Sequence, residues 1–125
     1  MMVLDSKTVM ELHDLLTRET GGSPELRDAG LLESALSSVY QTFGGVELYP
    51  TTEEKGARLG FALISNHAFV DGNKRIGMLV MLLYLELCGK PLETSNDEFI
   101  RIGLGVASGE VSYEKLLEWV KSSVK

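Results

Sequence analysis

Five polar side chains that could serve catalysis or anion binding fall within nine residues of this 125-residue chain: His67, Asp71, Asn73, Lys74 and Arg75. Histidine is the side chain best suited to take a proton near neutral pH. Aspartate offers the hard oxygen ligand that Mg²⁺ prefers, often together with substrate phosphates. The two cations offer charge to an anionic ligand. The cluster therefore predicts phosphoryl or nucleotidyl transfer, with His67 as general base and Asp71 orienting the acceptor or holding magnesium.

The residues around this cluster indicate that it opens a buried helix. Asp71-Gly72-Asn73 is typical of a turn in which Gly72 adopts positive φ, and Ile76–Cys88 is apolar at nearly every position. Such a segment predicts a helix that is buried on all sides. Its first backbone N–H groups have no partner within the helix, and the macrodipole adds positive charge there. We therefore expect an anion site formed by Gly72, Asn73, Lys74 and Arg75.

Each of these residues also has a structural interpretation when it is considered separately. Asp71 could be only a helix cap, and Lys74 and Arg75 could belong to a solvated first turn. His67 and Asp71 are four residues apart, as in some metal sites, but zinc takes three or four ligands and no further His or Cys lies close by in the sequence. Their convergence on one helix start favours the anion site. Phe69 is expected to be a buried anchor of the loop.

Hydrophobic periodicity and capping signals predict the helices that must hold the cluster in place. We expect helices at about Ser6–Thr20 and Ala29–Thr42, and a third that begins near Thr52 and ends at His67. The central helix then follows, with two more at about Ser95–Ala107 and Ser112–Val124. His13 is interpreted as a packed or surface residue of the first helix. Arg27-Asp28 could be a functional pair or a helix start, and the helix start is favoured. The chain is predicted to be one all-α domain, residues 1–125, with about six helices around the central one.

A glycine pair interrupts the helical pattern between Phe43 and Pro50. The short extended residues around Gly44 and Gly45 indicate a hairpin or flap, although an ordinary connecting loop is the simpler alternative.

Composition limits the classes of partner. The net charge of −6 argues against direct nucleic-acid binding and against an acidic membrane surface. Cys88 is the only cysteine, so no disulfide can form within the chain, and a reducing cytoplasm is expected. The start of the sequence lacks the pattern of a signal peptide, and the apolar run Met78–Leu85 is too short to span a bilayer.

The segment His67–Arg75, H-A-F-V-D-G-N-K-R, closely resembles the active-site motif of the Fic/Doc fold. It is most similar to the death-on-curing (Doc) toxin branch, in which a lysine follows Gly-Asn. The segments Leu26–Leu36 and Glu47–Pro50 also resemble that branch, and the resemblance extends from about His13 to about Gly109.

The resemblance implies a compact Fic/Doc-like helical bundle and an ATP-dependent protein kinase toxin. In that branch the γ-phosphate of ATP passes to a Ser/Thr hydroxyl of a target, elongation factor Tu, which blocks translation. It further implies Mg²⁺ at Asp71, a separate antitoxin protein as inhibitor, and a flap that lines the active site and holds the target by strand addition. The flap residues would be Val46, Glu47, Leu48 and Tyr49.

Two positions depart from the wider Fic pattern, H-x-F-x-[D/E]-G-N-G-R-x-x-R. Lys74 replaces its second motif glycine, and Met78 stands in place of its last arginine. No Ser/Thr-x-x-x-Glu-Gly/Asn segment, the internal inhibitory motif of Fic enzymes, is found. These departures favour phosphate transfer. An adenylyl or other nucleotidyl transferase is the alternative reaction, and a non-catalytic module that binds a partner is the alternative function.

Overall fold

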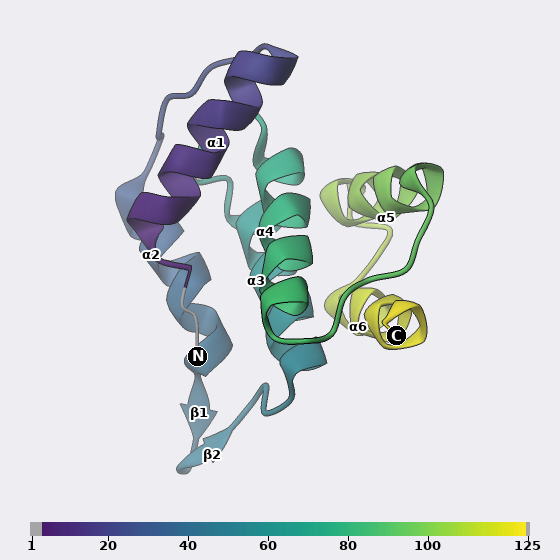
Figure 1. Cartoon of the computed structure of the whole chain (residues 1–125). Helices are drawn as coiled ribbons and strands as arrows, with labels where there is room; N and C mark the ends of the chain where they lie inside the picture. The colour runs from purple at the N-terminus through teal and green to yellow at the C-terminus, as the bar shows by residue number, and fades with distance from the viewer. Residues whose placement is uncertain (1–3, 125) are drawn as a thin grey trace.

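Six α-helices and one short hairpin make up the computed structural model of the chain, which describes residues 4–124 (Figure 1). The elements in order are α1 (Ser6–Thr20), α2 (Ala29–Ser37), the 3-10 turn η1 (Ser38–Tyr40), β1 (Thr42–Phe43), β2 (Val46–Glu47), α3 (Thr52–Asn66), α4 (Asn73–Leu87), α5 (Asn96–Ser108) and α6 (Tyr113–Ser123). The prediction of an all-α bundle of about six helices is confirmed.

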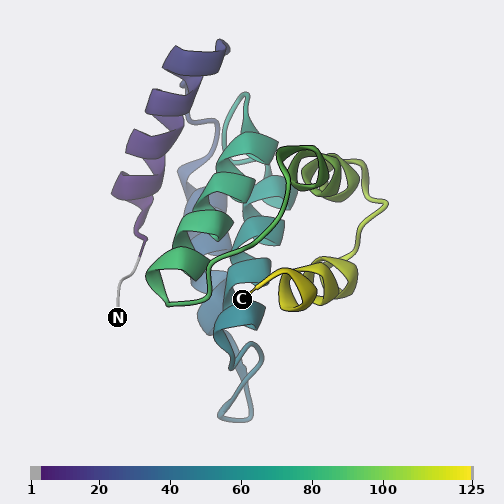
Figure 2. The same ribbon diagram turned by 45° about the vertical axis from the view of Figure 1, so that its right-hand side comes forward.

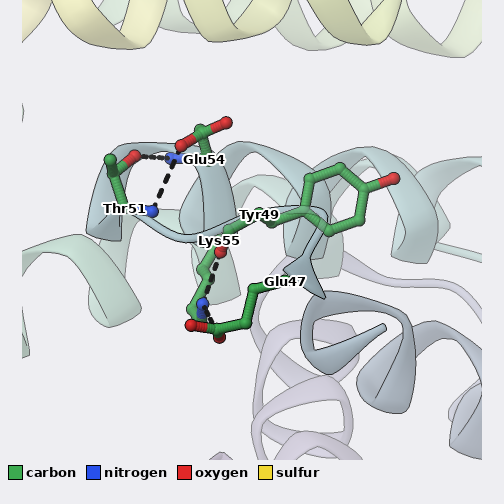
Figure 3. Close-up of polar contacts among 5 residues, drawn as sticks. All are labelled: Glu47, Tyr49, Thr51, Glu54 and Lys55. Carbon is green, nitrogen blue, oxygen red and sulfur yellow. Dashed lines mark hydrogen bonds and ion pairs between the residues drawn. The ribbon is translucent and has the colours of Figure 1, made fainter. Parts of the chain in front are cut away.

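Side-chain caps set where five of these six α-helices begin. Asp5, Asp28, Thr51, Ser95 and Ser112 each accept a hydrogen bond from a backbone N–H in the first turn of α1, α2, α3, α5 and α6. At α3 the capping box is complete, because the Glu54 side chain also accepts from the Thr51 backbone N–H at 3.2 Å (Figure 3). These helix starts were predictable because the capping signals lie within a few residues of the ends they cap.

The helices α3 and α4 lie antiparallel at the centre of the molecule, in unusually close contact. Gly56 and Gly60 on α3 and Gly77 on α4 make this approach possible. A Cβ atom at Gly77 would lie 2.6 Å from Ile64 Cγ1 and 3.0 Å from the Gly60 carbonyl oxygen. Glycine is therefore required at this crossing for steric reasons, and the two helices form a rigid central pair.

Two buried clusters flank the central pair. α1 and α2 lie on one side, and α5 and α6 lie on the other (Figures 1 and 2). The first cluster joins α1 and α2 to α3 and α4 through residues such as Val9, Leu32 and Leu63. The second joins α3 and α4 to α5 and α6 through residues such as Met81, Leu85 and Leu116.

α4 is central as predicted, but one stripe of it is not fully covered. Leu79 and Leu82 are only partly buried, and Leu87 is 53% exposed. Leu79 and Leu82 lie between α1 and α5, where they line an apolar groove of about 240 Å³. The expectation of burial on all sides is wrong for this stripe, because α1 and α5 do not meet over it. Within residues 4–124, no helix combines the length and the apolar character needed to cross a membrane.

The second helix ends earlier than predicted. It was expected to reach Thr42, but α2 stops at Ser37 and a 3-10 turn follows. The Ser37 and Ser38 hydroxyls donate to the carbonyls of Ser34 and Ala35, at 3.3 and 2.7 Å. Such local bonds compete with the regular helical pattern and help to end the helix.

The hairpin after this turn forms as predicted. Thr42 pairs with Glu47 and Phe43 with Val46, and Gly44 and Gly45 both have positive φ at the turn. A buried lysine of α3 holds the second strand, since Lys55 Nζ donates to Glu47 Oε1 at 2.8 Å and to the Tyr49 carbonyl oxygen (Figure 3).

Gly77→Ala should destabilise the protein, because the new methyl group meets backbone atoms that cannot move aside. Overpacking costs about 1–3 kcal/mol, and the better helix propensity of alanine returns up to about 1 kcal/mol. We expect a net loss of about 1–2 kcal/mol in the free energy of unfolding, measured by urea denaturation. Gly103→Ala is the control, because a Cβ there meets only the Met78 and Lys74 side chains. An equal loss in both variants would contradict the role given to the α3–α4 crossing.

Candidate active site

One hollow of about 280 Å³ brings together six of the residues singled out in the sequence. Its lining includes His67, Asp71, Gly72, Asn73, Lys74 and Arg75, together with residues of α3 and α5. The hollow lies where α3 ends and α4 begins, so both helices of the rigid central pair position its residues. His67 also lines a second hollow, of about 310 Å³, between α3 and the end of α5.

His67 lies just after α3, in a backbone conformation that side chains rarely adopt. Its φ and ψ are 52° and 48°, and it is the one non-glycine residue with positive φ among residues 4–124. Strained backbone of this kind costs on the order of 1–3 kcal/mol and persists only where neighbours enforce it. Arg27 supplies one restraint, because its side-chain Nε donates to the His67 carbonyl oxygen at 2.8 Å. His67 itself remains exposed to solvent.

The loop after His67 pairs with the segment that precedes α2. The backbone N–H groups of Arg27 and Asp28 donate to the Ala68 carbonyl, at 2.8 and 3.0 Å. The Val70 N–H donates to the Glu25 carbonyl at 3.0 Å. These backbone hydrogen bonds fix the loop after His67 to the segment before α2.

The Asn73 side chain closes the loop from the other end. Its Oδ1 accepts from the Phe69 backbone N–H at 3.0 Å, and its Nδ2 donates to the Phe69 carbonyl at 2.9 Å. Phe69 is 2% exposed and packs in the first buried cluster, where an anchor of the loop would be expected. The Asn73 amide is thus engaged within the protein, which leaves its backbone N–H to face a ligand.

The N-terminus of α4 is the only α-helix start between residues 4 and 124 without a side-chain cap. Gly72 occupies the cap position with φ 76° and ψ 18°, the positive φ that its sequence context predicted. Its own N–H donates to Asp71 Oδ1 at 2.9 Å. The N–H groups of Asn73, Lys74 and Arg75 follow, and no acceptor for them lies in the described chain. These three donors and the helix dipole make the hollow suited to an anion.

The two cations at this helix start differ in their contacts. Lys74 makes no ion pair or side-chain hydrogen bond with any residue that the structure describes, and it lines the hollow. Arg75 also lines the hollow, but its Nη1 donates to Thr20 Oγ1 at the end of α1. Lys74 is therefore the cation that is free to meet a ligand, whereas Arg75 also connects α4 to α1.

Asp71 is exposed and is the carboxylate at the mouth of this hollow. Across residues 4–124, no group of three or more His, Cys, Asp and Glu side chains could hold a metal ion. One carboxylate fits Mg²⁺, which commonly keeps several waters and shares substrate phosphates, better than it fits an ion held by protein ligands alone.

Sequence reasoning missed two contacts to the loop. His13 was expected to be an ordinary packed or surface residue, yet its Nε2 lies 2.6 Å from the Asp71 carbonyl oxygen, and its ring stacks on Phe69. Arg27 was interpreted with Asp28 as a helix start in preference to a functional pair. Asp28 is the cap of α2 as expected, and the contact of the Arg27 side chain with the His67 carbonyl was missed. These partners lie 58 and 40 residues apart in the chain, so no local pattern could have shown them.

The hairpin lies at the opposite end of α3 from His67. Val46, Glu47, Leu48 and Tyr49 were expected to line the active site. The hairpin instead lies beside the start of α3, whereas His67 follows the end of that 15-residue helix (Figures 1 and 2). A helix of this length separates them by about 22 Å. The two hollows that contain His67 are lined by other parts of the described chain.

Comparison with known proteins agrees with the fold and the motif. A model of the Fic/DOC family matches residues 3–85. The chain is 36% identical to Toxin Doc of Mycolicibacterium smegmatis over 91 residues, which cover 70% of each protein. It is 26% identical to Protein kinase doc of Escherichia phage P1 over 118 residues, which cover 94% of this chain and 92% of the phage protein.

The bundle combines a loop that begins at His67 with a helix, α4, whose N-terminus has no side-chain cap. The family match and the similarity to Toxin Doc show that this chain belongs to the Fic/DOC family. Its similarity to the two Doc proteins places it in the death-on-curing branch of that family.

Asn73→Ala should reduce the stability of the ligand-free protein, because it removes both side-chain bonds to the Phe69 backbone. Hydrogen bonds of this kind contribute about 1 kcal/mol each, so we expect a loss of about 2 kcal/mol in the free energy of unfolding, measured by urea denaturation. Asn66→Ala is the matched control, because the Asn66 amide makes one bond, to the Leu31 carbonyl at 3.2 Å, and should lose about half as much. Unchanged stability of Asn73→Ala would show that the amide does not hold the loop.

Proposed function

We propose that this protein is a Doc-type toxin that transfers the γ-phosphate of ATP to a serine or threonine hydroxyl of a target protein. The observation that carries the proposal is the exposed His67 beside the uncapped start of α4, with the unpaired Lys74 in the same hollow. The similarity to a protein named as a kinase over 94% of the chain supports phosphate transfer. Elongation factor Tu is the target that the branch suggests, with translation blocked in the cytoplasm as the result.

The proposed step needs a base, a bound phosphate and an aligned hydroxyl. His67 takes the proton of the target hydroxyl, whose oxygen forms a bond to the γ-phosphorus as the bond from that phosphorus to the β,γ-bridging oxygen breaks. ADP leaves, and the proton on His67 passes to solvent. Lys74 and the free N–H groups of α4 hold phosphate oxygens, and Asp71 orients the hydroxyl or is the ligand for Mg²⁺, which supplies charge neutralisation when it is bound.

Two positions favour transfer of phosphate over transfer of AMP. Lys74 adds a side chain and a charge where the wider family pattern has glycine, and this displaces the nucleotide so that its γ-phosphate faces His67. Met78 is 4% exposed and packs in the cluster between α4 and α5, so it offers no charge to a second phosphate. In-line geometry decides which phosphorus reacts, because this chemistry depends on positioning.

The apolar groove between α1 and α5 suits the antitoxin that the proposed toxin requires. Lys74 and Arg75 lie at the end of this groove that adjoins the active-site hollow, since both residues line both. An amphipathic helix with an acidic residue near these cations would fill the apolar part and cover the phosphate site. The groove is lined by Leu16, Lys74, Arg75, Met78, Leu79, Leu82, Phe99, Ile100 and Gly103.

Purified protein should label elongation factor Tu from γ-labelled ATP and not from α-labelled ATP. His67→Ala should reduce this labelling by about 10²–10⁴-fold, because the general base is lost, while the melting temperature stays within error of the parent protein. Cell lysate serves as a second acceptor in case the target is another protein. Label entering protein from α-labelled ATP would overturn the kinase proposal in favour of nucleotidyl transfer. No transfer from either ATP would favour the binding module.

Expression of the protein alone should arrest bacterial growth, and a co-expressed antitoxin, selected from genomic fragments of the source organism that restore growth, should cancel the arrest. Leu82→Glu should still arrest growth and should escape that antitoxin, because it puts a charge into the apolar groove without touching His67. Leu87→Glu is the control, since Leu87 lies on the same helix outside the groove lining. Equal rescue of the parent and Leu82→Glu would place the antitoxin elsewhere.

A further inference from the structure

A buried histidine outside the motif holds the backbone of the active-site loop. His13 lies on α1 and is 0% exposed. Its Nε2 is 2.6 Å from the carbonyl oxygen of Asp71, and its ring stacks on that of Phe69 with the ring centres 3.8 Å apart. His13 also lies close to Gly72, the next residue of the loop. A Cβ atom at Gly72 would lie 3.2 Å from His13 Nε2.

The hydrogen-bond partner fixes which ring nitrogen of His13 carries the proton. A carbonyl oxygen can only accept, so Nε2 must be the donor. The other nitrogen, Nδ1, is buried and has no hydrogen-bond partner among residues 4–124. An unsatisfied buried nitrogen costs stability, typically about 1–3 kcal/mol for a buried polar group without a partner. An apolar side chain would avoid this cost, so a residue chosen only for packing would not need to be histidine.

The peptide group between Asp71 and Gly72 is held at both of its ends. Its carbonyl accepts from His13, and its N–H donates to Asp71 Oδ1 at 2.9 Å. Rotation of this peptide would break both bonds and release the carboxylate. The direction of the Asp71 carboxylate is therefore coupled, through one rigid planar unit, to a donor on α1.

We propose that His13 is a positioning residue for phosphate transfer: it fixes the Asp71–Gly72 peptide and thereby the direction of the Asp71 carboxylate in the hollow that His67 also lines. The inference rests on the proposed function for its catalytic consequence, but the effect on the loop does not depend on it. His13 does not touch a substrate, and it acts through Asp71. Misplacement of a catalytic group by about 1 Å can cost roughly a hundredfold in rate, so a buried donor at this position can matter to the reaction.

The test compares two variants that both lack the ring and differ in the donor. His13→Leu fills the space without a donor, whereas His13→Gln retains an N–H that can reach the Asp71 carbonyl. We expect kcat for phosphate transfer to elongation factor Tu to fall about tenfold to a hundredfold in His13→Leu and to recover mostly in His13→Gln. The KM for ATP should change little, because Lys74 and the N–H groups of α4 remain.

A second readout works without any transfer. Hydrogen exchange of the Gly72 amide, followed by NMR in the apo protein, should be at least about tenfold faster in His13→Leu than in the parent protein, and His13→Gln should return it toward the parent rate. Val9→Ala is the stability control, because Val9 is also fully buried on α1 but its side chain has no hydrogen-bond donor for the Asp71 carbonyl. It should lower the free energy of unfolding and leave both kcat and the Gly72 exchange rate unchanged.

The outcomes separate this inference from the function on which it rests. If the parent protein transfers no phosphate, the proposed function is wrong. The Gly72 exchange rates would still show whether His13 holds the loop. Parent-like kcat and Gly72 exchange in His13→Leu would overturn the inference. A Val9→Ala variant that loses as much kcat would also overturn it, because the effect would then follow general stability. If His13→Leu does not fold, His13→Met takes its place, since methionine is apolar, flexible and of similar reach.

Discussion

The two hydrogen bonds between the Asn73 amide and the Phe69 backbone are the contact on which the site depends. They close the connection between α3 and α4 into one fixed loop, with His67 on one side and the first turn of α4 on the other. Without this closure, the loop that joins His67 to the first turn of α4 would lose its connection to the helix start. The close packing of α3 on α4 through Gly60 and Gly77 then sets the distance between them.

The site also carries features that an optimally stable protein would avoid. α4 begins without a side-chain cap, His67 adopts a left-handed backbone conformation, and Lys74 stands where the helix dipole disfavours a cation. A glycine in the cap position, in place of Ser, Thr, Asp or Asn, costs roughly a few tenths of a kcal/mol. The surrounding structure compensates with fixed contacts from α1 and from the segment before α2, which hold the loop through His13 and Arg27. An anionic ligand at the start of α4 would relieve part of the same cost.

Structural features that depend on residues close in the sequence were predicted correctly. Contacts between residues far apart in the sequence were missed. Capping side chains lie within a few residues of the helix ends that they define, so most helix starts were found, and Gly72 could be assigned positive φ from its turn. The motif residues were brought together correctly because they are adjacent in the chain. The partners of Asp71 and His67 on α1 and before α2 come together only in the folded chain. The open stripe of α4 was missed for the same reason, since an apolar run does not show which neighbours cover it. The hairpin directly precedes the start of α3, so the predicted length of that helix already separated it from His67; its placement at the active site came only from the family resemblance.

The separation between the hairpin and His67 sets the length of any segment that contacts both. A ligand confined to the hollow at His67 does not reach the hairpin at the other end of α3 (Figure 1). An extended segment that contacts both must cover about 22 Å, which is roughly seven residues at about 3.3 Å each. If the exposed strands of the hairpin hold a target, the acceptor hydroxyl must lie at a set spacing from the segment that pairs with them. The length of α3 would then act as a ruler, so that a hydroxyl is chosen by its distance along the target and not by its chemistry alone.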